Sequence, residues 1–162
     1  MIRQLLLLLV CVFSLSLCSF AQTKQASSAY KVPEKDCAAL KLKINNFITG
    51  INKVPGTSGL IIVYEGSDEM VVVNNKGQKT TRQILPRVGE IDHQISSLQE
   101  MVRSLNAPVD KIRIINGGFR KKFAIEFWAV PKGAAPPKPT PNLKRMKYQK
   151  EKFSPEFPYW DC

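Results

Sequence analysis

The sequence predicts an α+β fold in which a single small mixed sheet carries two amphipathic helices on one face and is followed by a Pro-rich extended tail. The chain has 162 residues, 44% of them hydrophobic, which suits one domain of ordinary size. Two stretches with helical periodicity alternate with short β-rich runs, which indicates one sheet with helices packed on it. Seven of the 11 prolines lie at or after residue 131, which indicates an extended end.

The elements are expected in the order strand, helix, strand, strand, helix, strand, strand, with a short first strand near 30–32. Pro33 can open the first helix, in which apolar residues recur at spacings of three and four, and Pro55-Gly56 ends it. The apolar positions are Cys37, Leu40, Ile44, Phe47 and Ile51. The next run, Leu60–Tyr64, is short and β-branched between glycines, which predicts a buried central strand.

The second half of the domain is expected to hold a further strand, the second helix and two more strands. Met70–Val73 and the turn at 74–77 predict a hairpin or edge strand. Pro86 is expected to open the second helix, whose apolar positions are Val88, Ile91, Ile95, Leu98, Val102 and Leu105. A strand is expected at 111–115, followed by a tight turn at Asn116-Gly117-Gly118 that favours positive φ. The alternation over 123–130 marks the last strand, which Pro131 ends.

The first 21 residues have the features of a cleaved secretory signal peptide. Arg3 is followed by an apolar run that is short for a membrane span of about 20 residues. A cut is expected between Ala21 and Gln22, with no transmembrane span left after cleavage and a periplasmic or secreted protein as the result. A retained N-terminal anchor and a lipoprotein are the alternatives. The expected organisation is a signal peptide at 1–21, a flexible leader at 22–29, the domain at 30–131 and a Pro-rich basic tail at 132–162.

Two of the four cysteines, Cys37 and Cys162, remain after such a cleavage and meet an oxidising compartment. They are a candidate disulfide that would tie the end of the chain to the start of the domain. The alternative is a buried Cys37 on a helix face and a free Cys162.

The sequence offers no catalytic residue, metal site or cofactor that we would assign. His93 is the single histidine, and its neighbour Asp92 lies on a different side of the predicted helix. Neither a phosphate-binding glycine loop nor a metal-ligand spacing is present. Acidic residues just beyond the central strand, Glu65, Asp68 and Glu69, are the only candidate catalytic set. An enzyme of unknown class is therefore the lowest alternative.

A binding function is better supported than catalysis, because a strongly basic protein attracts anionic polymers. The net charge is +11, and +10 once Arg3 is removed. An exported basic protein meets anionic wall polymers rather than nucleic acid. Arg120, Lys121 and Lys122 follow the glycine turn, where backbone N–H groups and cations can hold a carboxylate or phosphate. We expect a non-enzymatic envelope module that binds peptidoglycan, another anionic wall component or an envelope protein. The alternative is an interaction protein that acts through its Pro-rich, aromatic tail.

Two resemblances accompany these expectations. The segment 116–141, with NGGFR, an aromatic strand and VPKGAAPPKPTP, resembles a signature of uncharacterised exported bacterial proteins, as does the helix and strand of 37–64. The order of elements is similar to the peptidoglycan-binding C-terminal domain of outer-membrane protein A. That resemblance implies the fold and the envelope compartment. It transfers no binding residue, because the loop at 64–68 lacks the Thr-Asp pair of that family.

Overall fold

The computed structural model describes residues 25–32 and 37–154, and it confirms the predicted α+β class and order of elements. The strands are β1 (Ser27–Val32), β2 (Ser58–Val73), β3 (Lys79–Ile84), β4 (Ile112–Lys122) and β5 (Ala124–Val130). The helices are α2 (Cys37–Lys53) and α3 (Glu90–Ser104), with the short 3₁₀ turn η1 (Val109–Lys111) before β4. The predicted signal peptide lies outside the described residues, as do 155–162.

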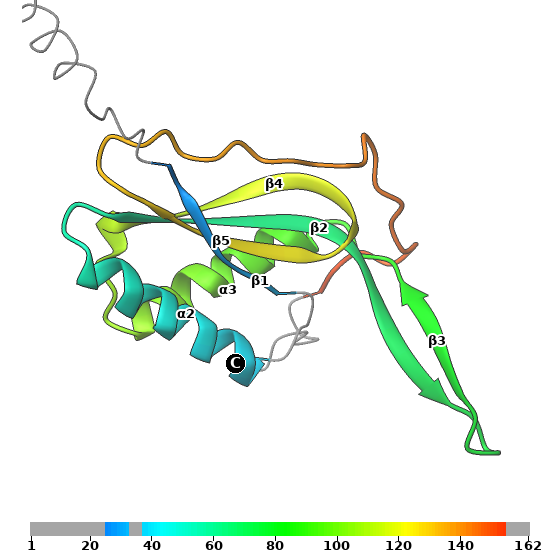
Figure 1. Ribbon diagram of the computed structural model, residues 1–162. Helices are drawn as coiled ribbons and strands as arrows, with labels where there is room; N and C mark the ends of the chain where they lie inside the picture. Colours follow the sequence, from blue (N-terminus) through cyan, green and yellow to red (C-terminus); the bar gives the residue numbers. More distant parts are fainter. Residues whose placement is uncertain (1–24, 33–36, 155–162) are drawn as a thin grey trace, which may run out of the picture.

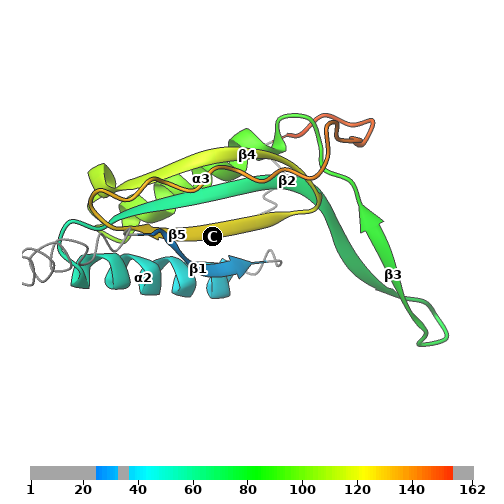
Figure 2. The ribbon, with the colours of Figure 1, turned by 45° about the horizontal axis from the view of Figure 1, so that its top comes forward.

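The first half of β2 is the centre of a mixed sheet. It pairs with β4 in parallel and with β5 antiparallel, and β1 pairs antiparallel with the far side of β5. Both helices lie under one face of this sheet (Figures 1 and 2). Among the described residues, no helix is both long enough and apolar enough to cross a membrane.

The main core lies between the sheet and the helix pair. Alternate residues of the strands meet the apolar stripes that the 3-and-4 spacing predicted, because side chains on a strand alternate between faces. Phe47 of α2 and Phe127 of β5 meet edge to face, with ring centroids 5.3 Å apart. The fully buried members include Leu40, Ile44, Ile61, Val63, Leu98, Ile125 and Phe127.

The central strand is much longer than the sequence predicted. It continues through Glu65 and Gly66 to Val73, so the three candidate catalytic carboxylates are part of β2 and not of a loop after it. The link from β4 to β5 crosses β2 at Gly66, where a Cβ would lie 2.2 Å from the carbonyl carbon of Lys122. The Phe123 N–H donates to the Ser67 carbonyl at the same point, over 3.0 Å. Glycine is therefore required where two backbone segments touch.

Three local predictions from the sequence differ from the structure. The expected flexible leader at 22–29 overlaps the first strand, because β1 begins at Ser27. Residues 116–118 do not form a hairpin turn, because β4 and β5 lie on opposite edges of β2; they continue β4, with the predicted positive φ only at Gly118. Helix α3 begins at Glu90 and not at Pro86. The Glu90 side chain accepts a hydrogen bond from the Arg87 N–H (2.9 Å), so the segment 86–89 leads into the helix without being part of it.

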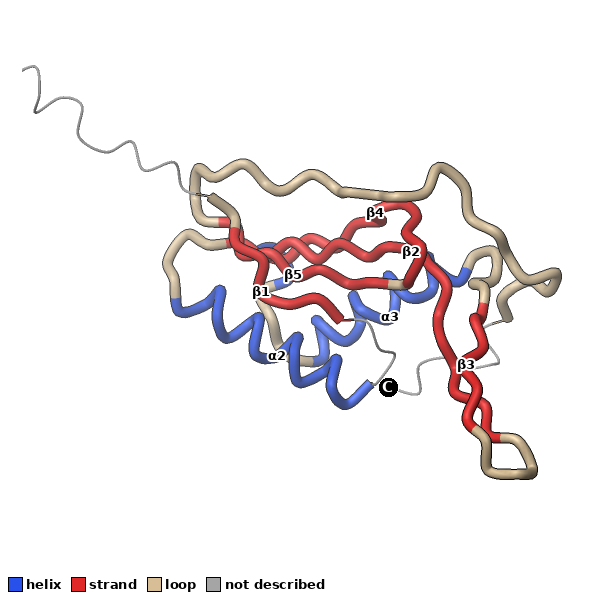
Figure 3. The backbone as a smooth tube through the Cα atoms, turned by 45° about the vertical axis from the view of Figure 1, so that its right-hand side comes forward, coloured by secondary structure: helices blue, strands red, loops and turns tan. Residues whose placement is uncertain are grey.

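Beyond the sheet, the second half of β2 pairs with β3 as a hairpin that projects from the domain (Figures 1 and 3). We call residues 68–84 the arm. The sequence-predicted hairpin is confirmed here, although its first strand is an extension of the central strand.

The Pro-rich segment after β5 runs across the face of the sheet opposite the helices (Figures 2 and 3). We call residues 131–154 the strap. Leu143 forms a β-bridge with Phe119, and the Gln149 N–H donates to the Pro86 carbonyl over 3.0 Å. Beneath the strap lies a second buried apolar cluster made of Leu60, Ile62, Tyr64 and Val130. The strap is extended as predicted, and it is packed on the domain.

Candidate functional site

The three cations predicted to bind an anion lie at the end of β4, and each has a different environment. The Arg120 guanidinium is largely buried and forms an ion pair with Glu126, at 2.9 Å between Nη1 and Oε1. Lys122 Nζ lies 2.9 Å from Glu69 Oε1, and both side chains are more than half exposed. Lys121 is exposed. Arg120 is thus engaged within the molecule, whereas Lys121 and Lys122 remain exposed.

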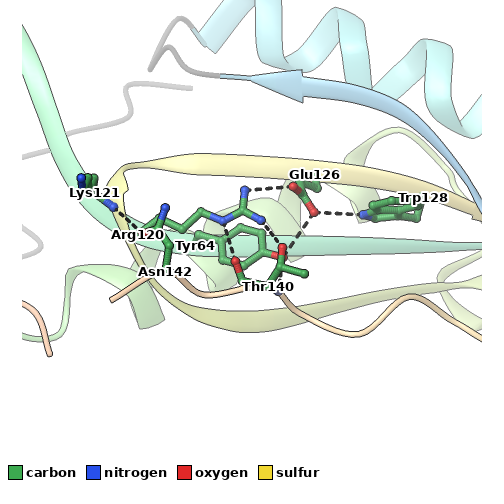
Figure 4. A network of polar contacts seen from close by, with 7 residues as sticks. All are labelled: Tyr64, Arg120, Lys121, Glu126, Trp128, Thr140 and Asn142. Atoms are coloured by element: carbon green, nitrogen blue, oxygen red, sulfur yellow. Dashed lines mark hydrogen bonds and ion pairs between the residues drawn. The ribbon is translucent and has the colours of Figure 1, made fainter. Parts of the chain in front are cut away.

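Arg120 is the centre of a polar network that fastens the strap to the sheet (Figure 4). Its Nη2 and Nε donate to the hydroxyl and carbonyl of Thr140 over 2.6 and 3.2 Å. Its Cζ lies 3.4 Å from the ring centroid of Tyr64, a cation–π contact. The Tyr64 hydroxyl accepts from the Thr140 N–H (3.0 Å) and donates to Glu126 Oε2 (3.2 Å). Nearby, Asn142 accepts from the Lys121 N–H over 3.0 Å.

Glu126 is the acceptor that holds this network together. Burial raises the pKa of the Glu126 carboxyl. The opposing effects are larger, so the pKa of Glu126 is lowered; they are hydrogen bonds from Arg120 and Trp128, the positive charge of Arg120 and the hydrogen bond from Tyr64. The carboxylate therefore stays charged to a lower pH than an ordinary glutamate does. Its three donors all belong to the sheet, and two of them, Arg120 and Tyr64, also contact Thr140 of the strap, so Glu126 orients the groups that hold the strap.

A second buried carboxyl, Glu65, has the opposite electrostatics. Burial raises its pKa, and the nearby charges of Glu90 and Asp92 raise it further against a hydrogen bond from Tyr148. The Tyr148 hydroxyl of the strap donates to Glu65 Oε2 over 2.9 Å, while Oε1 is buried and has no hydrogen-bond partner among residues 25–32 and 37–154. Burial and the carboxylate raise the pKa of Tyr148 to about 12, so it remains a donor. With 4% exposure, Glu65 is closed off from solvent and braces the strap.

The other sequence candidates are also accounted for. His93 is half-buried, with its ring 4.8 Å from that of Phe153 in the strap. Within the described residues no three His, Cys, Asp or Glu side chains are grouped as metal ligands. The candidate disulfide is not tested, because Cys162 lies outside the described residues; Cys37 is the first residue of α2.

A pocket of about 360 Å³ opens at the opposite end of the sheet from the arm. Because β2 and β4 are parallel, both begin there, and antiparallel β5 ends there. The strap starts at the same place through the turn Pro131–Ala134, in which the Ala134 N–H donates to the Pro131 carbonyl over 2.9 Å. Gly133 has φ +84°, as the third position of a type II turn requires. We call this space the strand-end pocket.

Three cations and one carboxylate line the strand-end pocket. Asp110 and Lys111 come from η1, Arg113 from the start of β4, and Lys132 from the strap turn. All four residues are exposed, so their charges act on solvent ions directly. Such a volume lies at the lower end of those that hold small molecules, and a guanidinium can bind a carboxylate or phosphate through two parallel hydrogen bonds. The pocket therefore suits an anionic group.

Sequence reasoning missed these three cations because they are not adjacent in the chain. Lys132 is about twenty residues from the other two, and only the parallel pairing of β2 with β4 brings the chain segments to one end of the sheet. The available signal was that each cation lies at or near a predicted strand end, Lys111 and Arg113 at the start of the strand 111–115 and Lys132 just after the strand 123–130.

Neither a protein-family model nor a curated protein nor a solved structure matches this chain. The resemblances to exported bacterial proteins and to the outer-membrane protein A domain therefore stay predictions.

Proposed function

We propose that this protein is an exported, non-enzymatic module of the bacterial cell envelope that binds an anionic wall component such as peptidoglycan, with an acidic surface of an envelope protein as the second candidate partner. The observation that carries the proposal is the strand-end pocket, which three cations and one carboxylate line. The secretory features of residues 1–21 and the net charge of +11 support the same compartment and the same class of partner.

The tail alternative has less support. The strap segment from Thr140 to Phe153 contacts its own domain through hydrogen bonds and a ring contact, so these residues are occupied within the molecule. The aromatic end at 157–160 lies outside the described residues.

Retention on purified peptidoglycan sacculi tests the proposal. The wild-type protein is compared with a pocket variant, Lys111→Ala/Arg113→Ala/Lys132→Ala, and with a matched control, Lys41→Ala/Lys53→Ala/Arg103→Ala, which removes three exposed cations from the helix layer. Both variants lose the same charge. We expect the pocket variant to bind at least about tenfold more weakly at low salt and the control to bind almost as wild type.

The salt dependence and the control variant distinguish binding at the strand-end pocket from binding through net charge alone. Screening shortens the range of charge interactions from about 10 Å at 0.1 M to about 3 Å at 1 M salt, so wild-type retention should fall as salt rises. Equal losses in both variants would show that net charge and not the pocket binds the wall. No retention of the wild type at low salt would overturn wall binding, and the same variants would then be tested against envelope proteins.

A further inference from the structure

The arm is exposed along its whole length. Every residue from 69 to 83 is exposed, and among the described strands β3 pairs only with β2. Four large apolar side chains stand in solvent on the arm: Met70, Val71, Val72 and Val73, with exposed fractions from 37% to 59%. A two-stranded ribbon without a core is marginally stable in water, and exposed apolar strands mark contact sites.

The outer edge of β2 in the arm is also unprotected. In the described part of the chain, residues 69–73 pair with β3 on one side, so the other edge presents backbone N–H and C=O groups to solvent. Edge strands are usually shielded by lysine, proline or a bulge, and Met70–Val73 has neither charge nor proline. This edge is open to pairing with another strand.

A strand fits this surface better than a lipid bilayer does. Val71 and Val73 lie on one face of the ribbon and Met70 and Val72 on the other, so no single apolar face is available for lipid. The unpaired backbone groups would cost several kcal/mol each in hydrocarbon, whereas a neighbouring strand would satisfy them.

We propose that the occupant is a second copy of this chain, whose arm pairs antiparallel with the first through the outer edges of the two β2 strands. Along the pairing edge the charge pattern is self-complementary: Asp68 and Glu69 lie at the base of β2 in the arm and Lys76 lies in the tip, while Lys79 and Arg82 belong to β3, on the side away from that edge. Antiparallel pairing centred on Val72 places the tip of each arm by the acidic base of the other. Like charges do not meet, and the central contacts are valine on valine.

The contact has two-fold symmetry, so it closes as a dimer. Five residues a side bury far less than the roughly 1,200 Å² of a standard stable interface, so we expect a weak dimer with a Kd of about 10–100 μM.

Sedimentation velocity of the full chain between about 1 and 200 μM tests the proposal. Val71→Lys/Val73→Lys puts lysine opposite lysine across the dimer, and Val71→Glu/Val73→Glu puts glutamate opposite glutamate. Each should raise the dimer Kd at least tenfold. An equimolar mixture of the two should associate again, because lysine then faces glutamate. The control Val54→Lys/Val109→Lys, at two exposed valines outside the arm, should dimerise as wild type.

A monomeric wild type at about 200 μM, or a mixture that fails to associate, would overturn the proposal. Co-sedimentation with vesicles of phosphatidylglycerol provides the competing outcome: if the monomer binds them and both arm variants do not, the arm contacts lipid and the dimer proposal fails. Since the arm residues changed here do not line the strand-end pocket, sacculus binding is expected to be unchanged in these variants.

Discussion

Two glutamates buried under the strap, Glu65 and Glu126, make opposite contributions to stability. The pKa of Glu126 is lower in the folded protein than its ordinary 4.5, so its contribution is present above that value and is lost as pH falls through the folded pKa. The pKa of Glu65 is raised, so the folded protein binds its proton more tightly than the unfolded chain does. Its carboxyl therefore disfavours folding increasingly as pH rises from 4.5 through the folded pKa.

Replacing each carboxyl by an amide should separate these effects. Glu126→Gln leaves the guanidinium of Arg120 without its ion pair and should lower the free energy of unfolding by about 2–3 kcal/mol at neutral pH. Glu65→Gln keeps an acceptor for Tyr148 and removes a buried charge, so it should raise the free energy of unfolding by about 1 kcal/mol at neutral pH. The stabilisation by Glu65→Gln should become smaller in acid, because the Glu65 carboxyl of the wild type is then protonated and carries no charge.

Urea unfolding at neutral pH and at about pH 5 measures both changes. Glu100→Gln, at an exposed position of α3, is the control and should change stability by less than about 0.5 kcal/mol. A Glu65→Gln protein that is less stable than wild type at neutral pH would contradict this account of the buried carboxyl.

At the scale of elements, the fold depends on the point where the link from β4 to β5 crosses β2. A Cβ at Gly66 would lie 2.2 Å from the carbonyl carbon of Lys122 and 2.3 Å from the Phe123 nitrogen. Both are backbone atoms, so no side-chain rotation can relieve the overlap. Gly66→Ala should therefore lower the free energy of unfolding by at least about 3 kcal/mol.

Gly50, in the last turn of α2, is the matched control, because apart from the backbone of its own helix nothing in the described part of the chain lies within 4 Å of a Cβ placed there. Gly50→Ala should raise the free energy of unfolding by about 1 kcal/mol through helix propensity. Thermal unfolding followed by circular dichroism measures both. A Gly66→Ala protein as stable as wild type would mean that the crossing differs from the one described.

At the scale of the whole molecule, the elements that depend on local periodicity could be predicted from the sequence. The features that depend on contacts between residues far apart in the chain could not. The stripes of α2 and α3 and the alternation of β5 gave the fold class. The extension of β2 was missed because the polar residues after Tyr64 are typical of a loop, and their burial depends on Tyr148 and Lys121, far along the chain. The strap has no internal hydrogen-bond pattern to predict its position, since polyproline-like segments lack one.

The candidate site shows the same division. Arg120, Lys121 and Lys122 are adjacent in sequence and easily noticed, yet Arg120 is used by Glu126 and Thr140. The cations of the strand-end pocket meet only because parallel and antiparallel pairing bring three chain segments to one end of the sheet. A run of cations in the sequence therefore does not show which cations the fold brings together, because that depends on the sheet topology.

The last whole-molecule prediction concerns the covalent closure of the chain. Cys37 and Cys162 are 162 − 37 = 125 residues apart, and a disulfide over such a loop contributes up to about 4–5 kcal/mol, more commonly 2–4. The exported chain should begin at Gln22. If Cys37 and Cys162 pair in the oxidising compartment, its mass should increase by two hydrogens on reduction. Cys162→Ser should lower Tm by roughly 5–15 °C.

The double-mutant cycle distinguishes the bond from two separate thiols. Cys37→Ser, Cys162→Ser and the double variant should all lose about the same stability, because each removes the same bond. Additive losses with a mass that reduction does not change would show that the cysteines act independently. A chain that retains Met1, with both cysteines reduced, would contradict the proposed export as well, since the pairing is expected only where the compartment is oxidising.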